Sequence, residues 1–445
     1  MRHLAQALAL LRSGRLRRGA VHATLTTTMV NLLVLAINLG TGLLTARFLG
    51  PEGRGELAAM ILWPQFLASL LTLGLPQAAT FHLVRQPEQR AGITAVLLVA
   101  SLLLGAVVAL AGIAVIPAWT GQYEPGVVAF AQGIMVYAPL ILFMWAVNAC
   151  LQAQGAFHRI NRNLLLQPAL ALLGLGLLGA LGRLTPFTAA AATVLAPLPV
   201  YVRNAWWLWR HHRPAWVEAR ANAARLLRYG LRSWGVQLLG ALSAQFDRVF
   251  VLSLLSPAAM GLYVVARNAA QPTRLFADAL NTVLFPKASA LEADAAVDLT
   301  LIATRVGLVA AAIIAVPLVL LGPRLLTLVY GAEFVTAGLA FQLLLVEGAL
   351  TAVTTTMVQA FMSVERPEIA TLLRAVAFAA TLAFLTALVP PLGIVGAALA
   401  LLAAAILRLL LTMVCFPLIL GVRLPRLWLS SGDLRLILHA RGASA

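Results

Sequence analysis

Long apolar runs fill most of the chain, and short polar breaks separate them. A helix needs about 20 apolar residues to cross the hydrocarbon core of a bilayer. Many of the breaks carry glycine and proline, as at Gly50-Pro51 and Pro390-Pro391, which end or bend helices. Twelve runs of this kind lie near residues 21–48, 55–82, 92–117, 126–153, 162–181, 186–208, 230–254, 257–285, 300–322, 334–363, 367–389 and 393–420. The pattern therefore predicts an all-α integral membrane protein with twelve transmembrane helices.

One of these runs, between Pro257 and Pro286, carries a stripe of polar residues. At 100° per residue the polar positions fall within an arc of about 80°, so they share one helix face. An arginine at the bilayer centre costs about 2.5–3.5 kcal/mol on insertion scales, so two arginines on this face disfavour contact with lipid. We expect the face to line a cavity that suits a negatively charged ligand. The stripe consists of Tyr263, Arg267, Gln271, Arg274, Asp278 and Asn281.

Composition supports the membrane class and explains the positive charge. The chain is 61% hydrophobic and only 11% charged, whereas soluble domains carry about 25% charged residues. The net charge of +17 could indicate nucleic-acid binding, but the basic residues lie in short loops between apolar runs. The tails and loops predicted on the same side of the membrane as the N-terminus hold 21 Lys and Arg residues, and the loops on the opposite side hold three. The positive-inside rule then places both termini in the cytoplasm. We therefore expect a multi-pass protein of the cell inner (plasma) membrane, without a nucleic-acid partner.

The chain also repeats itself at an interval that corresponds to six spans. One match aligns Gly55 with Gly261 at an offset of 206 residues, and another aligns Arg159 with Arg366 at an offset of 207. Because six is even, the halves have the same orientation and should be related by a pseudo-two-fold axis along the membrane normal, with a site between them. The predicted parts are a basic cytoplasmic N-tail (1–20), an N-terminal six-helix bundle (21–208), a cytoplasmic linker (209–229), a C-terminal six-helix bundle (230–420) and a basic cytoplasmic C-tail (421–445).

Charge within the predicted spans is concentrated in the second half. That half holds seven arginines and three acids, whereas the first half holds only Arg47. A structural salt-bridge network would tend towards neutrality, so the surplus favours a cationic wall for an anionic substrate, with the structural network as the alternative. The first span adds uncharged polar groups that suit sugar hydroxyls or helix–helix hydrogen bonds. The candidate substrate-binding residues are Arg267, Gln271, Arg274, Arg305, Asn31 and Asn38.

The intramembrane acids are candidates for ion coupling. A buried carboxylate without a strong partner favours its protonated form, so Asp247, Asp278 and Glu347 could carry a coupling proton. Each could instead pair with an arginine, and Asp278 lies four residues after Arg274, at ion-pair spacing. No cluster of cysteine and histidine has metal-ligand spacing, so the sequence predicts no metal and no cofactor apart from a coupling H⁺ or Na⁺.

Two stretches resemble a known transporter family. The segment from Leu43 to Gly55, with Arg47-Phe48-Leu49-Gly50-Pro51 at its centre, is similar to the first hairpin of polysaccharide-type flippases in the multidrug/oligosaccharidyl-lipid/polysaccharide exporter superfamily. Further similarity lies in Asp247-Arg248, Gly261-Leu262-Tyr263 and Leu284-Phe285-Pro286. The resemblance implies a V-shaped pair of six-helix bundles, alternating access, and transport of undecaprenyl-pyrophosphate-linked oligosaccharides. Peptidoglycan-precursor flippases of the superfamily typically have fourteen spans, whereas this chain has room for twelve.

Together these features predict a transporter that flips a lipid-linked oligosaccharide for polysaccharide biosynthesis. Its expected partners are that substrate, membrane lipids and polysaccharide assembly proteins. A cation-coupled multidrug exporter of the same fold is the alternative, although organic cations need an acidic cavity. A membrane polysaccharide polymerase or ligase is a further alternative, but the longest external stretch, Ile116–Pro125, has one acid, Glu124, and no histidine. Without a nucleophile–base pair there, we expect no enzyme activity.

Overall fold

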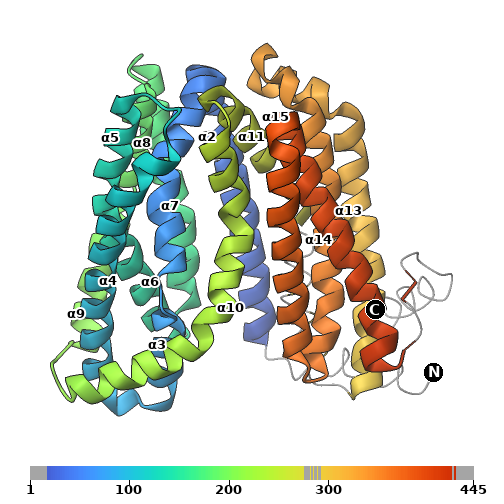
Figure 1. The fold of residues 1–445 in the computed structure, drawn as a ribbon. Coiled ribbons are helices and arrows are strands. Elements are labelled where there is room, and N and C mark those ends of the chain that lie inside the picture. The colour runs from blue at the N-terminus through green and yellow to red at the C-terminus, as the bar shows by residue number, and fades with distance from the viewer. Residues whose placement is uncertain are drawn as a thin grey trace. The chain divides into compact units, whose positions relative to one another are not determined.

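The structure is a computed structural model, and it describes residues 18–274, 281, 284, 288, 292–422 and 425–426. These residues form helices joined by short turns (Figure 1). Contacts divide the chain into two compact units. The N-unit is Met29–Val265 with Val329–Phe334, and the C-unit is Met1–Thr28, Ala266–Leu328 and Val335–Ala445.

Helix α2 (Arg18–Leu70) is bent at one glycine. Gly50 has φ 65° and ψ −175°, a conformation that glycine adopts without steric cost, and Pro51 follows it. The apolar part, Met29–Leu70, has 42 residues, which at about 1.5 Å per residue is roughly twice the hydrocarbon thickness. The bend divides α2 into two arms, as predicted spans 21–48 and 55–82 would require.

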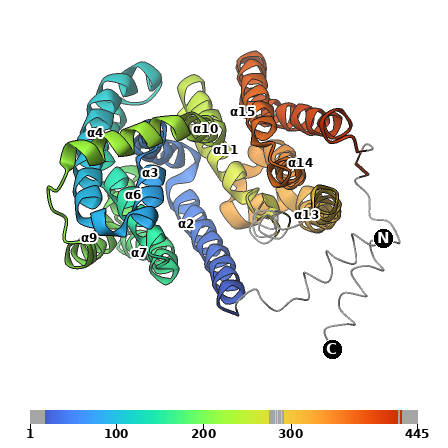
Figure 2. The same ribbon diagram turned by 90° about the horizontal axis from the view of Figure 1, so that it is seen from below.

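The rest of the N-unit surrounds a core of small and apolar side chains. The core includes Leu97 of α4, Ala146 and Val147 of α6, and Trp207 of α9. Figure 2 views the helices end-on and shows α3, α4 and α6 lying together. The elements are α3 (Leu75–Arg85), η1 (Pro87–Gln89), α4 (Arg90–Trp119), α5 (Pro125–Ile134), η2 (Met135–Tyr137), α6 (Ala138–Ala153), α7 (Phe157–Ala180), α8 (Pro186–Leu195), α9 (Leu198–His212), α10 (Ala219–Leu254) and the start of α11 (Pro257–Ala269).

Proline and threonine fix several helix starts. Pro125 and Pro186 are the first residues of α5 and α8, where the missing N–H is not needed. Thr185 and Thr188 form a capping box at the start of α8. His212, the last residue of α9, is buried, and its Nδ1 lies 2.8 Å from Oγ1 of Thr94. The end of α9 is thereby tied to α4.

The C-unit contains most of α13 (Ala293–Tyr330), part of η3 (Ala332–Ala337), α14 (Gly338–Ser363) and α15 (Pro367–Leu420). Helix α15 has 54 residues and bends at Gly393, which has φ 56° and follows Pro390-Pro391, so it also consists of two arms. The rings of Phe361 and Phe416 lie 5.1 Å apart in the core between α14 and the second arm of α15.

The structure refines the predicted spans. Seven helical stretches of the described residues are long and apolar enough to cross a membrane, which agrees with the predicted all-helical membrane protein. Predicted span 55–82 is interrupted between α2 and α3, where Leu73 and Gly74 have positive φ. Predicted spans 126–153 and 186–208 are interrupted at η2 and before α9. Part of the predicted linker is continuous with α10, which starts at Ala219. The count of twelve spans and the orientation of the termini stay predictions.

Candidate functional site

The two repeated segments meet backbone to backbone inside the N-unit. A Cβ atom added at Gly55 would lie 1.7 Å from the carbonyl oxygen of Pro257. A Cβ atom added at Gly261 would lie 1.9 Å from the carbonyl oxygen of Pro51. The contact is reciprocal, because each glycine faces the proline of the matching segment. Only glycine allows α2 and α11 to approach this closely.

Asp247 of α10 lies beside α11 and is held by a tyrosine. The hydroxyl of Tyr263 donates a hydrogen bond of 2.6 Å to Oδ2 of Asp247. Both residues are buried in the N-unit. A charge-assisted hydrogen bond of this kind stabilises the carboxylate. Tyr263, the first residue of the predicted stripe, therefore donates a hydrogen bond to one of the candidate coupling acids.

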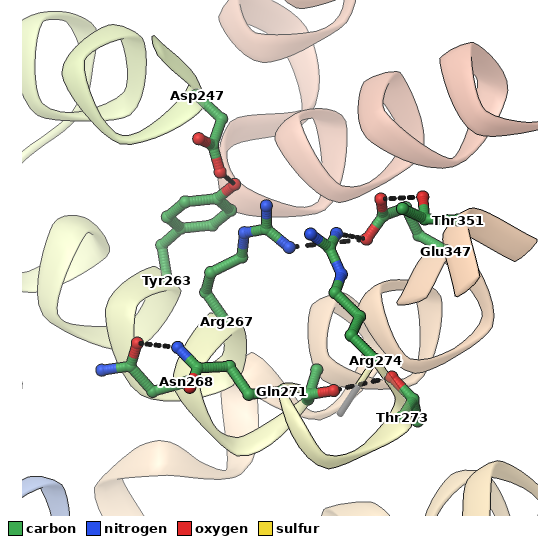
Figure 3. A network of polar contacts seen from close by, with 10 residues as sticks. Asp247, Tyr263, Arg267, Asn268, Gln271, Thr273, Arg274, Glu347 and Thr351 are labelled. Carbon is green, nitrogen blue, oxygen red and sulfur yellow. Dashed lines mark hydrogen bonds and ion pairs between the residues drawn. The ribbon is translucent and has the colours of Figure 1, made fainter. Parts of the chain in front are cut away.

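The C-unit contains a second acid, Glu347, which joins two arginines of the stripe. Arg274 Nη2 donates to Glu347 Oε2, and Arg267 Nη1 lies 3.4 Å from the same oxygen. Oγ1 of Thr351, one turn further along α14, donates to Oε1 at 2.8 Å. Figure 3 shows both guanidinium groups pointing towards the carboxylate. We call Arg267, Arg274, Glu347 and Thr351 the Glu347 cluster.

A close helix approach brings the cluster together. Helix α11 ends at Ala269, and a turn at Ala270 and Gln271 precedes the next helical residues. There, Oγ1 of Thr273 lies 2.2 Å from the place where a Cβ atom at Gly348 would be. Because Gly348 has no side chain, the segment after the turn packs directly on α14 and sets Arg274 beside Glu347.

The Glu347 cluster is largely buried and contains two arginines and one acid. Arg267 is 8% exposed and Glu347 is 5% exposed, so water screens their charges weakly. Within the cluster, one carboxylate accepts from two guanidinium groups. Arg408, on the second arm of α15, lies within electrostatic reach of Glu347 and Arg274, and Arg374, on the first arm, lies within reach of Arg408.

The other candidate residues lie outside this network or outside the described residues. Gln271 donates to Oδ1 of Asn268 at 3.5 Å. Arg305 is half-buried on α13 in the C-unit. Asn31 and Asn38 are exposed on α2 in the N-unit. Asp278, the predicted partner of Arg274, lies outside the described residues. In the part of the chain that the structure describes, no group of three or more His, Cys, Asp or Glu side chains could hold a metal ion.

Arg408 is the residue that the sequence analysis did not select. It is half-buried, and the groups that act on its charge are Arg374, Glu347 and Arg274. Arg374 and Arg408 lie at similar distances before and after Gly393, so a bend at Gly393 would bring them to one level. The sequence signal that could have paired them is Pro390-Pro391 followed by Gly393, which together predict a bend in the helix.

Comparison with protein families identifies the family of this chain. The model of the family described as "Polysaccharide biosynthesis protein" matches residues 20–292, more than half of the chain. The protein belongs to this polysaccharide biosynthesis family, a family of multi-pass membrane transporters, which points to a non-enzyme.

Comparison with solved structures identifies the fold. A lipid II flippase MurJ in an inward closed conformation has a TM-score of 0.76 at 12% identity, with 93% of this chain and 90% of that chain covered. An inward-facing multidrug resistance MATE family transporter of the MOP superfamily has a TM-score of 0.70 at 18% identity, with 95% and 99% covered. An outward-facing MATE family transporter of that superfamily has a TM-score of 0.60 at 17% identity, with 90% and 96% covered. At these identities the likeness shows the fold. A comparison with curated protein sequences finds no match.

Proposed function

We propose that the protein flips a lipid-linked oligosaccharide, of the undecaprenyl-pyrophosphate type, across the inner membrane by alternating access. Membership of the polysaccharide biosynthesis family supports this substrate class. The observation that carries the proposal is the Glu347 cluster, in which a buried arginine and a half-buried arginine share one buried carboxylate. Pyrophosphate presents several oxygens that accept hydrogen bonds from guanidinium groups in a bidentate manner, which suits this arrangement.

In this mechanism Glu347 holds the arginines when the headgroup is absent. The arriving phosphate takes over the guanidinium donors of Arg267 and Arg274, and Glu347 then loses its counterions. A carboxylate left without counterions in a buried site favours its protonated form, so headgroup binding takes up a proton there. This makes Glu347 the coupling acid that we favour, while the hydrogen bond from Tyr263 stabilises the charged form of Asp247. Arg408 and Arg374 extend the cationic surface beside it.

A cation-coupled multidrug exporter is the second candidate, favoured by the similarity of fold to MATE family transporters. An exporter of organic cations needs a surplus of acid in its cavity. In the described part of the C-unit, Glu347 forms ion pairs with two arginines and acts on the charge of a third, Arg408. The charge balance therefore supports the flippase.

The test replaces the two arginines singly by alanine in cells that depend on this protein for surface polysaccharide. Arg267→Ala and Arg274→Ala should each reduce export at equal expression. Arg324→Ala is the matched control, because this exposed arginine also belongs to the C-unit. Normal export by both cluster variants would show that the arginines do not bind the substrate. A changed drug resistance with normal export would favour the multidrug exporter instead.

A further inference from the structure

Three arginines and an asparagine gather where the start of α7 faces α9, within the N-unit. Arg203 Nη2 donates a hydrogen bond of 2.8 Å to Oδ1 of Asn163. One turn closer to the start of α7, the guanidinium of Arg159 lies 4.9 Å from the centre of the Trp207 ring. Arg162 is exposed, and both it and Arg159 repel the charge of Arg203. We call Arg159, Arg162, Asn163 and Arg203 the Arg203 site; the proposed transport mechanism does not use it.

Two hydrogen-bond donors of this site are buried without an acceptor in the part of the chain that the structure describes. Asn163 is only 1% exposed, and its Nδ2 has no hydrogen-bond partner. The orientation of its amide follows from Arg203, because a guanidinium group can only donate and must therefore face Oδ1. Nε of Arg203 is also buried without a partner. Since a buried donor without an acceptor destabilises the fold, both groups favour a ligand that accepts hydrogen bonds.

The surrounding chain supplies no negative charge to the Arg203 site. From residue 125 to residue 217 the sequence contains six arginines and no Asp or Glu. The next acid, Glu218, lies 3.4 Å from Arg225 in an ion pair. None of the ion pairs among the described residues involves an arginine of the site. The first turn of α7 also has no acid, although the N-terminal end of a helix favours negative charge.

The corresponding part of the second repeat lacks these features. At the offset of 207 residues, Arg159 corresponds to Arg366, which directly precedes α15. The first turn of α15 contains an acid, Glu368. Asn163 and Arg203 correspond to Ala370 and Leu410, so the second repeat has neither buried donor. Arg366 is therefore a matched control for the arginines of the Arg203 site.

Exposed tryptophans indicate that the Arg203 site lies at the headgroup level of a membrane. Trp206 and Trp209 of α9 are 57% and 69% exposed, and Arg210 lies over the Trp206 ring at 4.1 Å. Tryptophan is enriched where membrane-spanning segments reach the headgroups. Arg203 precedes Trp206 by three residues, which is about 4.5 Å along a helix. The anion available at this depth is the phosphate of a lipid, and basic pockets between membrane helices bind such headgroups.

We propose that the Arg203 site binds the phosphate group of an anionic membrane phospholipid. Its oxygens accept hydrogen bonds from Arg203 and Asn163, while Arg159 and Arg162 balance its charge. The headgroup thereby satisfies the buried donors and holds the start of α7 against α9. The site belongs to the N-unit and the Glu347 cluster to the C-unit, so this proposal does not rest on the proposed function.

The test measures thermal unfolding of the purified full-length protein in an uncharged detergent at constant ionic strength. Phosphatidylglycerol is titrated, with phosphatidylcholine as the reference because its own cation competes with the arginines. The unfolding midpoint of the wild type should rise to a plateau with phosphatidylglycerol and much less with phosphatidylcholine. Arg162→Gln, which changes an exposed side chain, should raise the half-saturating concentration several-fold. Arg366→Gln, which changes an exposed arginine of the second repeat, should leave it unchanged.

Asn163→Asp tests the buried position separately. Aspartate has nearly the same shape as asparagine, so a carboxylate takes the place of the missing anion beside Arg203. Without lipid the variant should be more stable than the wild type, and phosphatidylglycerol should stabilise it little. A less stable variant would contradict the need for an anion. An equal response of Asn163→Asp and the wild type to phosphatidylglycerol would overturn the proposal, as would equal stabilisation of the wild type by the two lipids.

Two further probes identify the source of the phosphate. Inorganic phosphate and an undecaprenyl-pyrophosphate lipid are titrated in the same assay. If inorganic phosphate stabilises the wild type as well as phosphatidylglycerol does, the ligand is a free anion and the lipid assignment is wrong. If only the pyrophosphate lipid stabilises it and Arg162→Gln weakens that response, the site belongs to the transported substrate and the proposal fails. None of these outcomes depends on export.

Discussion

Replacing Glu347 with glutamine separates a substrate site from a purely structural salt-bridge network. Glutamine has nearly the same shape, so the packing of α14 is preserved while the charge is removed. The variant loses the ion pairs to Arg267 and Arg274. Breaking a buried pair by removing one partner costs about 3–5 kcal/mol, because the other charge stays buried. The unliganded variant should therefore be less stable by about this amount.

Binding of an anionic headgroup should change in the opposite direction. In the wild type the headgroup displaces the Glu347 carboxylate, whereas in Glu347→Gln the arginines have no competing anion. If the headgroup restores even half of the lost energy, its affinity rises at least tenfold, since about 1.4 kcal/mol corresponds to a factor of ten. An undecaprenyl-pyrophosphate lipid should therefore raise the unfolding temperature of the variant more than that of the wild type.

The assay is thermal unfolding in detergent with and without the pyrophosphate lipid. Glu368→Gln is the control, because it removes an exposed acid from the same unit and should behave as the wild type. A variant that loses stability but gains no additional stabilisation from the lipid would refute the substrate site. The Glu347 cluster would then be a structural network.

Three further predictions concern the N-unit. Gly55→Ala should prevent the close approach of α2 and α11 and reduce both thermal stability and export. Gly235→Ala is the control, because a Cβ atom at Gly235 has no other atom within 4 Å; it should be neutral or stabilise α10 by about 0.5–1 kcal/mol in thermal unfolding. Tyr263→Phe should lower the unfolding free energy by about 1–3 kcal/mol, because Asp247 loses a buried donor; an unchanged stability would show that this hydrogen bond is unimportant. Burial lowers the pKa of His212, which lies beyond the end of predicted span 186–208, from 6.5 to about 4, so the unfolded chain takes up the proton first as the pH falls. The contribution of neutral His212 to stability is therefore complete above pH 6.5 and is lost as the pH falls towards 4. His212→Gln should flatten this part of a pH–stability curve.

The sequence predicted the helical elements well because apolar length and turn residues are local signals. Predicted span 92–117 corresponds to α4, Arg90–Trp119. The internal repeat pointed to Gly55 and Gly261, which the structure places in direct contact. A span such as 186–208 was not resolved into two helices, because its apolar character continues through the break before α9.

The partners in the site were harder to predict because they are distant in sequence. Spacing along one helix suggested Asp278 as a partner of Arg274, and this stays a prediction because Asp278 lies outside the described residues. The partner that the structure describes is Glu347, which approaches because Gly348 lacks a side chain. Arg54 lies in the break between predicted spans 21–48 and 55–82, so the sequence did not predict its burial. Its burial depends on the packing of other segments around it, which no local pattern records.

The reciprocal contact of Gly55 and Gly261 has the geometry of an isologous dimer interface, in which one surface is its own complement. A polypeptide with a single copy of the repeat could form the same contact with a second copy of itself. Fusion of two copies in one chain frees the two sides to differ. At the offset of 206 residues, Arg54 corresponds to Met260, a buried apolar residue. Both repeats thus share the backbone contact, whereas only the first repeat has a buried charge, Arg54, beside it. One repeat can therefore acquire a new side chain at this position without a change in the fold.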